Sequence, residues 1–181
     1  SEIKDCKNKY DIFITGSDQV WGPGKKGVDP DSAYFLKFAD DYQKFSYAAS
    51  FGVSDISDEK IPVMKSLMDG FQTLSVREES AVKIVKKITG KDALCHIDPT
   101  FLLPSDEWKK IAVTRIKTPY ILVFNVKPVK SLLDFAENLS GAKNIPVIYI
   151  TDNPQKKHQG FTYVSAPTVE EFLGYFLNAT Y

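Results

Sequence analysis

The segment Asp11-Ile-Phe-Ile-Thr-Gly-Ser-Asp-Gln-Val-Trp21 joins a short apolar run directly to a polar turn. The run Ile12 to Ile14 predicts a strand of the continuous apolar kind, which is buried on both faces of a parallel sheet. Gly16 permits a tight exit from that strand. Because ligands in open α/β sheets bind beyond the carboxyl ends of the strands, residues 17–19 stand where polar groups meet a substrate.

Two interpretations of this polar turn stay open on position alone. In the first, Ser17, Asp18 and Gln19 contact a substrate, with Asp18 as a base or an anchor. In the second, Ser17 or Asp18 only caps a following turn or helix, which serine and aspartate do often.

Length and composition predict a folded globular chain of one or two domains. The 181 residues are 43% hydrophobic and 13% aromatic, which is ample for a packed core. Lysine plus arginine and aspartate plus glutamate both total 23, so the formal net charge is zero. Without a net positive field, nucleic acid and other polyanions are not expected as partners.

The two cysteines, Cys6 and Cys95, match no metal-ligand or disulfide spacing, and we expect no metal site. Cys95 follows two apolar residues, which predicts a small buried side chain. No apolar stretch is long enough to cross a bilayer, and the first twenty residues lack a secretory signal pattern. We therefore expect a cytoplasmic protein without a membrane span.

Strand and helix patterns alternate along the chain, which predicts parallel sheets covered by helices, an α/β class. Helices are expected over residues 58–71, 77–89, 105–111, 130–139 and 168–178. Further strands are expected over residues 44–50, 73–76, 94–97, 120–124, 147–150 and 161–164. A basic stretch, Arg115 to Pro119, marks the expected boundary between a first domain, 1–114, and a second, 115–181.

Five sequence blocks resemble the polysaccharide pyruvyl transferase family in order and approximate spacing. They are Tyr-Asp-Ile-Phe-Ile-Thr-Gly-Ser-Asp-Gln-Val-Trp (10–21), Phe-Ser-Tyr-Ala-Ala-Ser-Phe-Gly (45–52), Ser-Val-Arg-Glu-Glu-Ser (75–80), His-Ile-Asp-Pro-Thr-Phe-Leu-Leu (96–103) and Ala-Pro-Thr-Val-Glu-Glu-Phe-Leu (166–173). The resemblance spans nearly the whole chain but only the middle of the family's length. We expect the family's opening strand and helix before Ser1 and its Ser-Phe-His segment just after Tyr181, and neither is part of this chain.

The resemblance implies a partial glycosyltransferase-B-like architecture of two Rossmann-like domains, the second incomplete. It also implies transfer of pyruvate from phosphoenolpyruvate to two hydroxyls of a sugar or glycan acceptor, which forms a cyclic ketal in cell-surface or extracellular polysaccharide synthesis. Phosphoenolpyruvate is the donor substrate, and no further cofactor is expected. The acid, by resemblance, is the histidine of the missing segment, so this chain alone is expected to be inactive.

Ketal formation requires an acid and a base, and Asp18 is the candidate base in this chain. Arg77 is expected to open a helix after a strand, where its guanidinium and free N–H groups face an anion. The alternative for Arg77 is a pair with Glu78, Glu79 or another surface acid. The candidate substrate-binding residues are Gly16, Ser17, Gln19, Trp21, Ser50 and Asp98; for Trp21 core packing is an alternative to stacking on a sugar, and Asp98 either reaches the cleft or caps a turn.

Two other functions use the same residues differently. A nucleotide-sugar glycosyltransferase on the same architecture would bind a nucleoside diphosphate sugar and no phosphoenolpyruvate. A non-catalytic α/β binding domain would tolerate substitution of Asp18 and Arg77. The oligomeric state and the identity of the acceptor sugar are not addressed by the residues.

Overall fold

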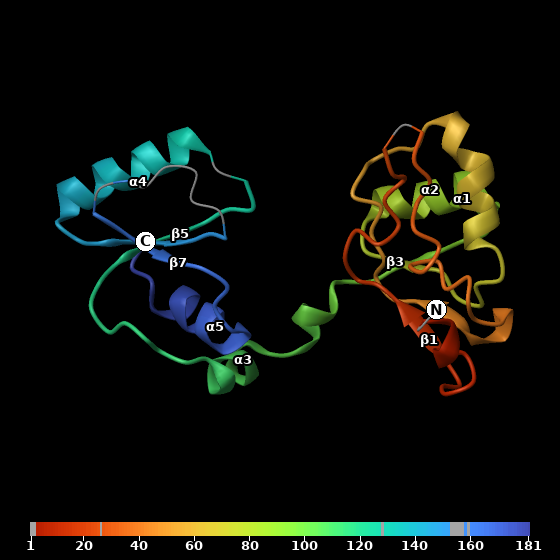
Figure 1. Ribbon diagram of the computed structural model, residues 1–181, viewed down its shortest axis with the longest axis horizontal. Helices are drawn as coiled ribbons and strands as arrows, with labels where there is room; N and C mark the ends of the chain where they lie inside the picture. The colour runs from red at the N-terminus through yellow and green to blue at the C-terminus, as the bar shows by residue number, and fades with distance from the viewer. Residues whose placement is uncertain (1–2, 26, 128, 153–157, 159) are drawn as a thin grey trace. The chain divides into compact units, whose positions relative to one another are not determined.

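A computed structural model describes residues 3–25, 27–127, 129–152, 158 and 160–181 of the chain. The chain divides into two compact units, Ser1–Leu102 and Leu103–Tyr181. Both units are parallel sheets flanked by helices, as Figure 1 shows. The expected α/β class is confirmed, and each unit is consistent with a Rossmann-like fold.

The described residues of the first unit form four short parallel strands. β1 (Phe13–Thr15) pairs with β2 (Lys44–Ser46), and β3 (Ser75–Val76) pairs with β4 (Leu94–Cys95). Parallel bridges from Phe45 to Thr73 and from Ala49 to Val76 place β2 beside β3. The strands therefore lie in chain order, and their carboxyl ends gather at one edge.

Two α-helices and several 3-10 turns accompany these strands in the part of the first unit that the structure describes. α1 (Ile61–Met68) and α2 (Glu79–Thr89) pack against each other. The apolar residues of α2 recur at helical spacing, and Ala81, Ile84, Val85 and Ile88 are buried in the core. The 3-10 turns are η1 (Lys4–Cys6), η2 (Asp41–Gln43), η3 (Asp58–Lys60) and η4 (Pro99–Leu102).

The expectation that the first strand is buried on both faces is wrong. Ile12 and Ile14 are 54% and 66% exposed, whereas Phe13 packs against the core and Thr15 is buried, so among the described residues only one face of this segment is covered. The expectation of a buried Cys95 is also wrong. Cys95 is exposed on β4, which pairs only with β3 in the described part of the chain.

The second unit is a three-stranded parallel sheet between helices. Its strands β5 (Ile121–Phe124), β6 (Val147–Ile150) and β7 (Phe161–Val164) lie in the order β5-β6-β7, and the central strand β6 is buried along its whole length. α4 (Lys130–Lys143) covers one face, while α5 (Val169–Asn178) and α3 (Ser105–Ile111) lie on the other (Figure 1). On that second face, the Phe124 ring meets Phe172 edge-on at 5.1 Å.

The division between the units falls before α3, whereas the sequence pattern placed residues up to 114 in the first domain. α3 packs on α5 within the second unit. The backbone N–H of Val113 donates to the carbonyl of Glu170 at 2.8 Å, and Arg115 Nε donates to Glu171 at 2.9 Å. A basic stretch alone does not reveal these long-range contacts.

The backbone of Tyr181 lies beside β5. Leu122 N–H donates to the Tyr181 carbonyl at 2.8 Å, and Thr180 N–H donates to the Tyr120 carbonyl at 2.9 Å.

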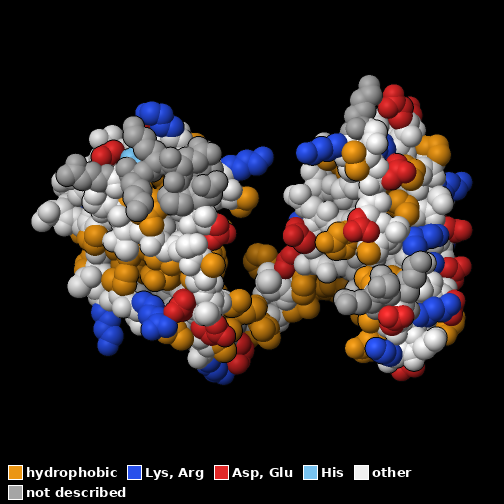
Figure 2. Space-filling model, in the orientation of Figure 1, with side chains coloured by type: hydrophobic (Ala, Val, Ile, Leu, Met, Phe, Trp, Pro, Cys, Tyr) orange, Lys and Arg blue, Asp and Glu red, His pale blue; other side chains and the backbone are white. Residues whose placement is uncertain are grey.

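On the visible face of each unit, positively and negatively charged side chains are interspersed, as Figure 2 shows. Among the residues that the structure describes, no helix combines the length and the apolar character that a bilayer crossing requires.

Candidate functional site

Four chain segments bring polar side chains to the carboxyl edge of the first sheet. Ser17 follows β1, Tyr47 follows β2, Arg77 follows β3, and Asp98 follows β4 after a short extension. Parallel strands in sequence order make these positions neighbours. This is the edge at which open α/β sheets bind their ligands.

Asp98 is the centre of a hydrogen-bond network at this edge. Its Oδ2 accepts from the Ser17 hydroxyl at 2.9 Å and from Arg77 Nη1 at 3.1 Å. Its Oδ1 accepts from the backbone N–H of Thr100 at 3.0 Å and from the Thr100 hydroxyl at 2.8 Å. Asp98 therefore caps the turn and also reaches the other strand ends, so both alternatives weighed for it are realised.

The network strongly favours the ionised form of Asp98. Hydrogen bonds from Thr100, and then from Ser17 and Arg77, lower the pKa of the Asp98 carboxyl well below its usual range. Hydrogen bonds to Glu78 and Asp98 raise the pKa of Arg77. The site thus contains an ion pair between Arg77 Nη1 and Asp98 Oδ2 at 3.1 Å, whose side chains are only 27% and 21% exposed.

Arg77 does not occupy the helix position expected for it. α2 begins at Glu79, and the backbone N–H of Arg77 donates to the Ala49 carbonyl at 3.1 Å, so it is not available to an anion. The guanidinium also bonds Glu78, with Nε donating to Oε1 at 3.0 Å. Among the described residues, Nη2 has no hydrogen-bond partner, which leaves this end of the guanidinium available.

A close backbone approach explains the glycine in the turn after β1. Gly16 has φ +135°, and a Cβ at that position would lie 1.9 Å from the Tyr47 carbonyl oxygen. Only glycine allows the two strand ends to approach in this way. Gly16 therefore shapes the edge and presents no side chain to a ligand.

Ser50 holds the following turn from behind. Its backbone N–H donates to the Asp18 carbonyl at 3.1 Å, and its carbonyl accepts from Trp21 N–H at 3.0 Å. The hydroxyl accepts from Gly52 N–H at 3.0 Å, and the residue is fully buried. Ser50 thus positions the turn and is not accessible to a substrate in this structure.

The carboxylate of Asp18 and the amide of Gln19 are exposed at the turn. Asp18 Oδ1 accepts from the neighbouring Gln19 N–H at 2.7 Å, and among the described residues the next helical turn begins only at Asp41. The Gln19 side chain lies over Gly52. The Asp18 carboxylate is therefore open to solvent and to a ligand.

Trp21 belongs to the core, which is the alternative that the sequence analysis left open beside stacking on a sugar. The residue has no exposed surface, and its ring lies 5.4 to 6.0 Å from the rings of Phe35, Phe51 and Phe71. Its Nε1 donates to the Tyr34 carbonyl at 3.4 Å. The position of a tryptophan two residues after a polar turn does not predict whether its ring is buried or exposed.

Sequence reasoning missed one cluster at the same edge, formed by Tyr47, Ser75 and His96. Nδ1 of His96 lies 2.8 Å from the Ser75 hydroxyl, and the Tyr47 and His96 rings are stacked with centroids 5.6 Å apart. His96 is exposed, two residues before Asp98. That spacing was the available signal, because residues two apart along an extended segment share a face.

N–H donors at this edge suit an anionic ligand. Arg77 Nη2 and the imidazole of His96 are such groups, and carboxylate and phosphate oxygens accept hydrogen bonds from them. Within the described ranges, no group of three or more histidine, cysteine, aspartate or glutamate side chains is arranged to hold a metal.

A family model described as polysaccharide pyruvyl transferase matches residues 1–181. No significant match was found among curated proteins or among solved structures.

Proposed function

The chain belongs to the polysaccharide pyruvyl transferase family, and we propose that the protein transfers pyruvate from phosphoenolpyruvate to two hydroxyls of a sugar in cell-surface or extracellular polysaccharide biosynthesis. The observation that carries this proposal is the family match over the whole chain. The network at the strand ends supports it, since Arg77 and Asp98 lie in two different matching blocks and meet there.

The reaction balances without a further co-reactant. Two sugar oxygens form bonds to the central carbon of phosphoenolpyruvate, and the bond from that carbon to the phosphate ester oxygen breaks. The proton count of one hydroxyl is matched by the proton that the methylene carbon gains when it becomes a methyl group. The proton of the second hydroxyl leaves with the phosphate as hydrogen phosphate.

Arg77 is the proposed anion-binding residue. Its contacts with Asp98 and Glu78 fix the guanidinium in one orientation, and Nη2 is left to donate to the carboxylate or phosphate of phosphoenolpyruvate. Such a fixed group loses little side-chain entropy when a ligand binds. Asp98 and Ser17 act as positioning residues for this guanidinium.

Asp18 is the proposed general base for an attacking sugar hydroxyl. Its exposed carboxylate stands on a turn that Ser50 and the close approach of Gly16 hold in place. The family resemblance assigns the acid for the methylene carbon to the histidine of a Ser-Phe-His segment, and the assay therefore uses the protein of the natural reading frame.

The test is phosphate release from phosphoenolpyruvate in the presence of candidate sugars, with the pyruvylated product identified by mass spectrometry. Asp18→Asn and Arg77→Lys should each lower kcat/KM by about a hundredfold or more. Asp92→Asn is the matched control, because Asp92 forms only an exposed pair with Lys86 and should keep full activity.

Three outcomes would contradict the proposal. The first is no phosphate release with any acceptor. The second is binding of a uridine or guanosine diphosphate sugar with no binding of phosphoenolpyruvate, which indicates a glycosyltransferase. The third is ligand binding that is unchanged in both variants, which indicates a binding domain without catalysis at this edge.

A further inference from the structure

A second polar cluster, formed by Ser75 and His96, lies beside the Asp98 network and has no role in the function proposed above. The Ser75 hydroxyl oxygen is 2.8 Å from His96 Nδ1, and Ser75 is only 2% exposed. The same oxygen accepts the backbone N–H of Ala48 at 3.0 Å. These two hydrogen bonds connect Ser75 to residues that follow the neighbouring strands β2 and β4.

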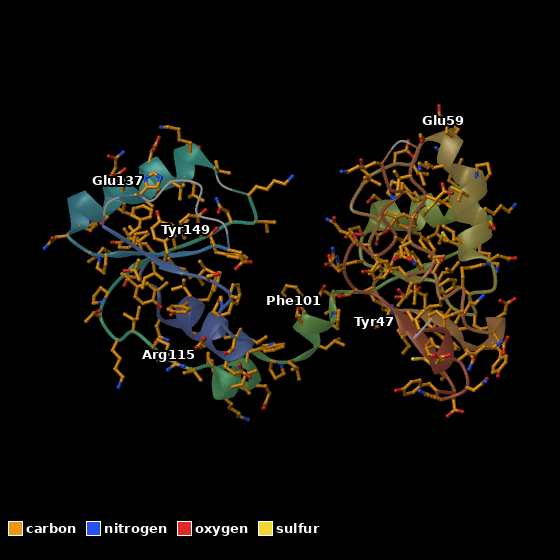
Figure 3. The ribbon with its side chains drawn as sticks, viewed as in Figure 1. Tyr47, Glu59, Phe101, Arg115, Glu137 and Tyr149 are labelled. Carbon is orange, nitrogen blue, oxygen red and sulfur yellow. The ribbon has the colours of Figure 1, made fainter. Side chains whose placement is uncertain are left out.

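Ser46 and Tyr47 also contact this cluster. Ser75 N–H donates to the Ser46 hydroxyl at 2.8 Å, and that hydroxyl donates back to the Ser75 carbonyl at 3.1 Å. The Tyr47 ring, labelled in Figure 3, lies almost parallel to the His96 ring, with an angle of 6° between them. The imidazole is therefore fixed in both position and plane.

The contacts of Ser75 determine which imidazole nitrogen carries the proton. A serine hydroxyl donates one proton and accepts through two lone pairs. The Ala48 N–H can only donate, so it occupies a lone pair. Among the described residues, His96 Nδ1 is the one remaining partner, and a buried hydroxyl without an acceptor is costly.

The Ser75 hydroxyl consequently donates to Nδ1, and the proton of the neutral ring lies on Nε2. His96 is exposed, and Nε2 has no partner within the described part of the chain. In the β3-β4 ladder Ser75 pairs with Leu94, and His96 N–H donates to the Val76 carbonyl, so Arg77 stands opposite His96. A neutral donor there adds a directed hydrogen bond without a second positive charge beside Arg77.

We propose that the neutral imidazole of His96 donates its Nε2–H to an anionic oxygen of phosphoenolpyruvate bound at Arg77. This assignment deepens the proposed function and rests on it. His96 is then a binding residue of defined tautomer, and Ser75 is the positioning residue that sets the tautomer.

The tautomer is tested without any substrate, by long-range ¹⁵N NMR of the histidine rings at pH 7.5. We expect Nδ1 of His96 to give the signal of an unprotonated nitrogen and Nε2 that of a protonated one. The chain has one other histidine, His158, so the spectrum of His96→Gln assigns the signals. Ser75→Ala should shift His96 towards a mixture of tautomers; an Nδ1–H tautomer in the unsubstituted protein would overturn the inference.

The ligand is tested by calorimetric titration with phosphoenolpyruvate. His96→Leu should weaken binding about tenfold or more, because one hydrogen bond to a charged oxygen is lost. His96→Gln retains an N–H donor and should stay within about threefold of the unsubstituted protein. Unchanged affinity in His96→Leu, or an equal loss in both variants, would overturn the assignment.

The two arms separate this inference from the proposed function. If the unsubstituted protein binds no phosphoenolpyruvate, the proposed function fails and the ligand assignment fails with it. The NMR result then still decides the tautomer. If phosphoenolpyruvate binds with an affinity that does not depend on His96, only the role assigned to His96 is overturned.

Discussion

Replacing Asp98 by asparagine removes the charge at the centre of the strand-end network while keeping the size of the side chain. The two bonds from Thr100 and the one from Ser17 survive in this variant, because an amide oxygen still accepts and the Ser17 hydroxyl accepts from the amide. The bond from Arg77 Nη1 is lost, since the amide NH₂ then faces a guanidinium N–H.

The structure sets the size of the effect. A hydrogen bond to a charged group is worth about 1.5–3 kcal/mol. The Arg77 and Asp98 side chains are 27% and 21% exposed, so solvent screening reduces this to about 1 kcal/mol. For a unit of this size, that loss lowers the unfolding midpoint by about 4–8 °C.

The effect should depend on pH, because Asp98 has a lowered pKa in the folded state. The stability that its ionised form contributes is fully present above the unfolded pKa of about 3.9, and it is lost as the pH falls through the lower folded pKa. The difference between the unsubstituted protein and Asp98→Asn should therefore be constant from pH 7 to about pH 5 and shrink below about pH 4.

Tryptophan fluorescence can follow the first unit separately. The chain has two tryptophans, Trp21 in the core of the first unit and Trp108 in α3 of the second. In a Trp108→Phe background, denaturant unfolding followed by Trp21 reports on the first unit. Asp92→Asn, which alters an exposed pair in the same unit, should change stability by less than about 0.5 kcal/mol. A loss from Asp98→Asn that is the same at pH 7 and pH 3 would refute the explanation that the loss comes from the charge of Asp98.

Three glycine-to-alanine substitutions should give three different results in denaturant unfolding, with Gly16→Ala made in the Trp108→Phe background and the other two in the chain that keeps both tryptophans. Gly16→Ala places a Cβ 1.9 Å from the Tyr47 carbonyl oxygen at φ +135°, so the first unit should lose about 3 kcal/mol or more; stability near that of the unsubstituted protein would contradict the close approach. Gly174→Ala in α5 meets the Val113 carbonyl oxygen at 1.9 Å and should destabilise the second unit, as seen by fluorescence of Trp108, while the first unit unfolds unchanged. Gly141→Ala in α4 has open space around the new Cβ and should stabilise the second unit by up to about 1 kcal/mol; a loss there would show that the helix interior is crowded after all.

Local patterns predicted most of the elements of this fold. The helical spacing of apolar residues and the closing Gly90 identified α2, although it begins two residues later than expected, at Glu79. The runs at 147–150 and 161–164 are strands β6 and β7 with the expected bounds. These elements were predicted correctly because the apolar pattern of a helix or a buried strand lies within a run of consecutive residues.

Burial was predicted less well, because apolarity does not reveal which neighbours a strand acquires. Ile14 is exposed on an edge strand, and Trp21 is enclosed by three phenylalanine rings that are distant in the chain. Cys95, after two apolar residues, is exposed on another edge strand. The glycosyltransferase-B-like arrangement of the two units stays a prediction.

From polar residues at the ends of apolar runs, the sequence alone identified Ser17, Asp18 and Asp98 as candidates, and the family resemblance of the block 75–80 added Arg77. It did not reveal which of them meet. Ser17 and Asp98 are 81 residues apart in the chain, and Ser75 and His96 are 21 apart. Only the parallel register of four strands brings these pairs within hydrogen-bond distance, because hydrogen bonds depend on positions in space that no local pattern encodes. The polar turn after β1 is therefore part of a site that four strands build together.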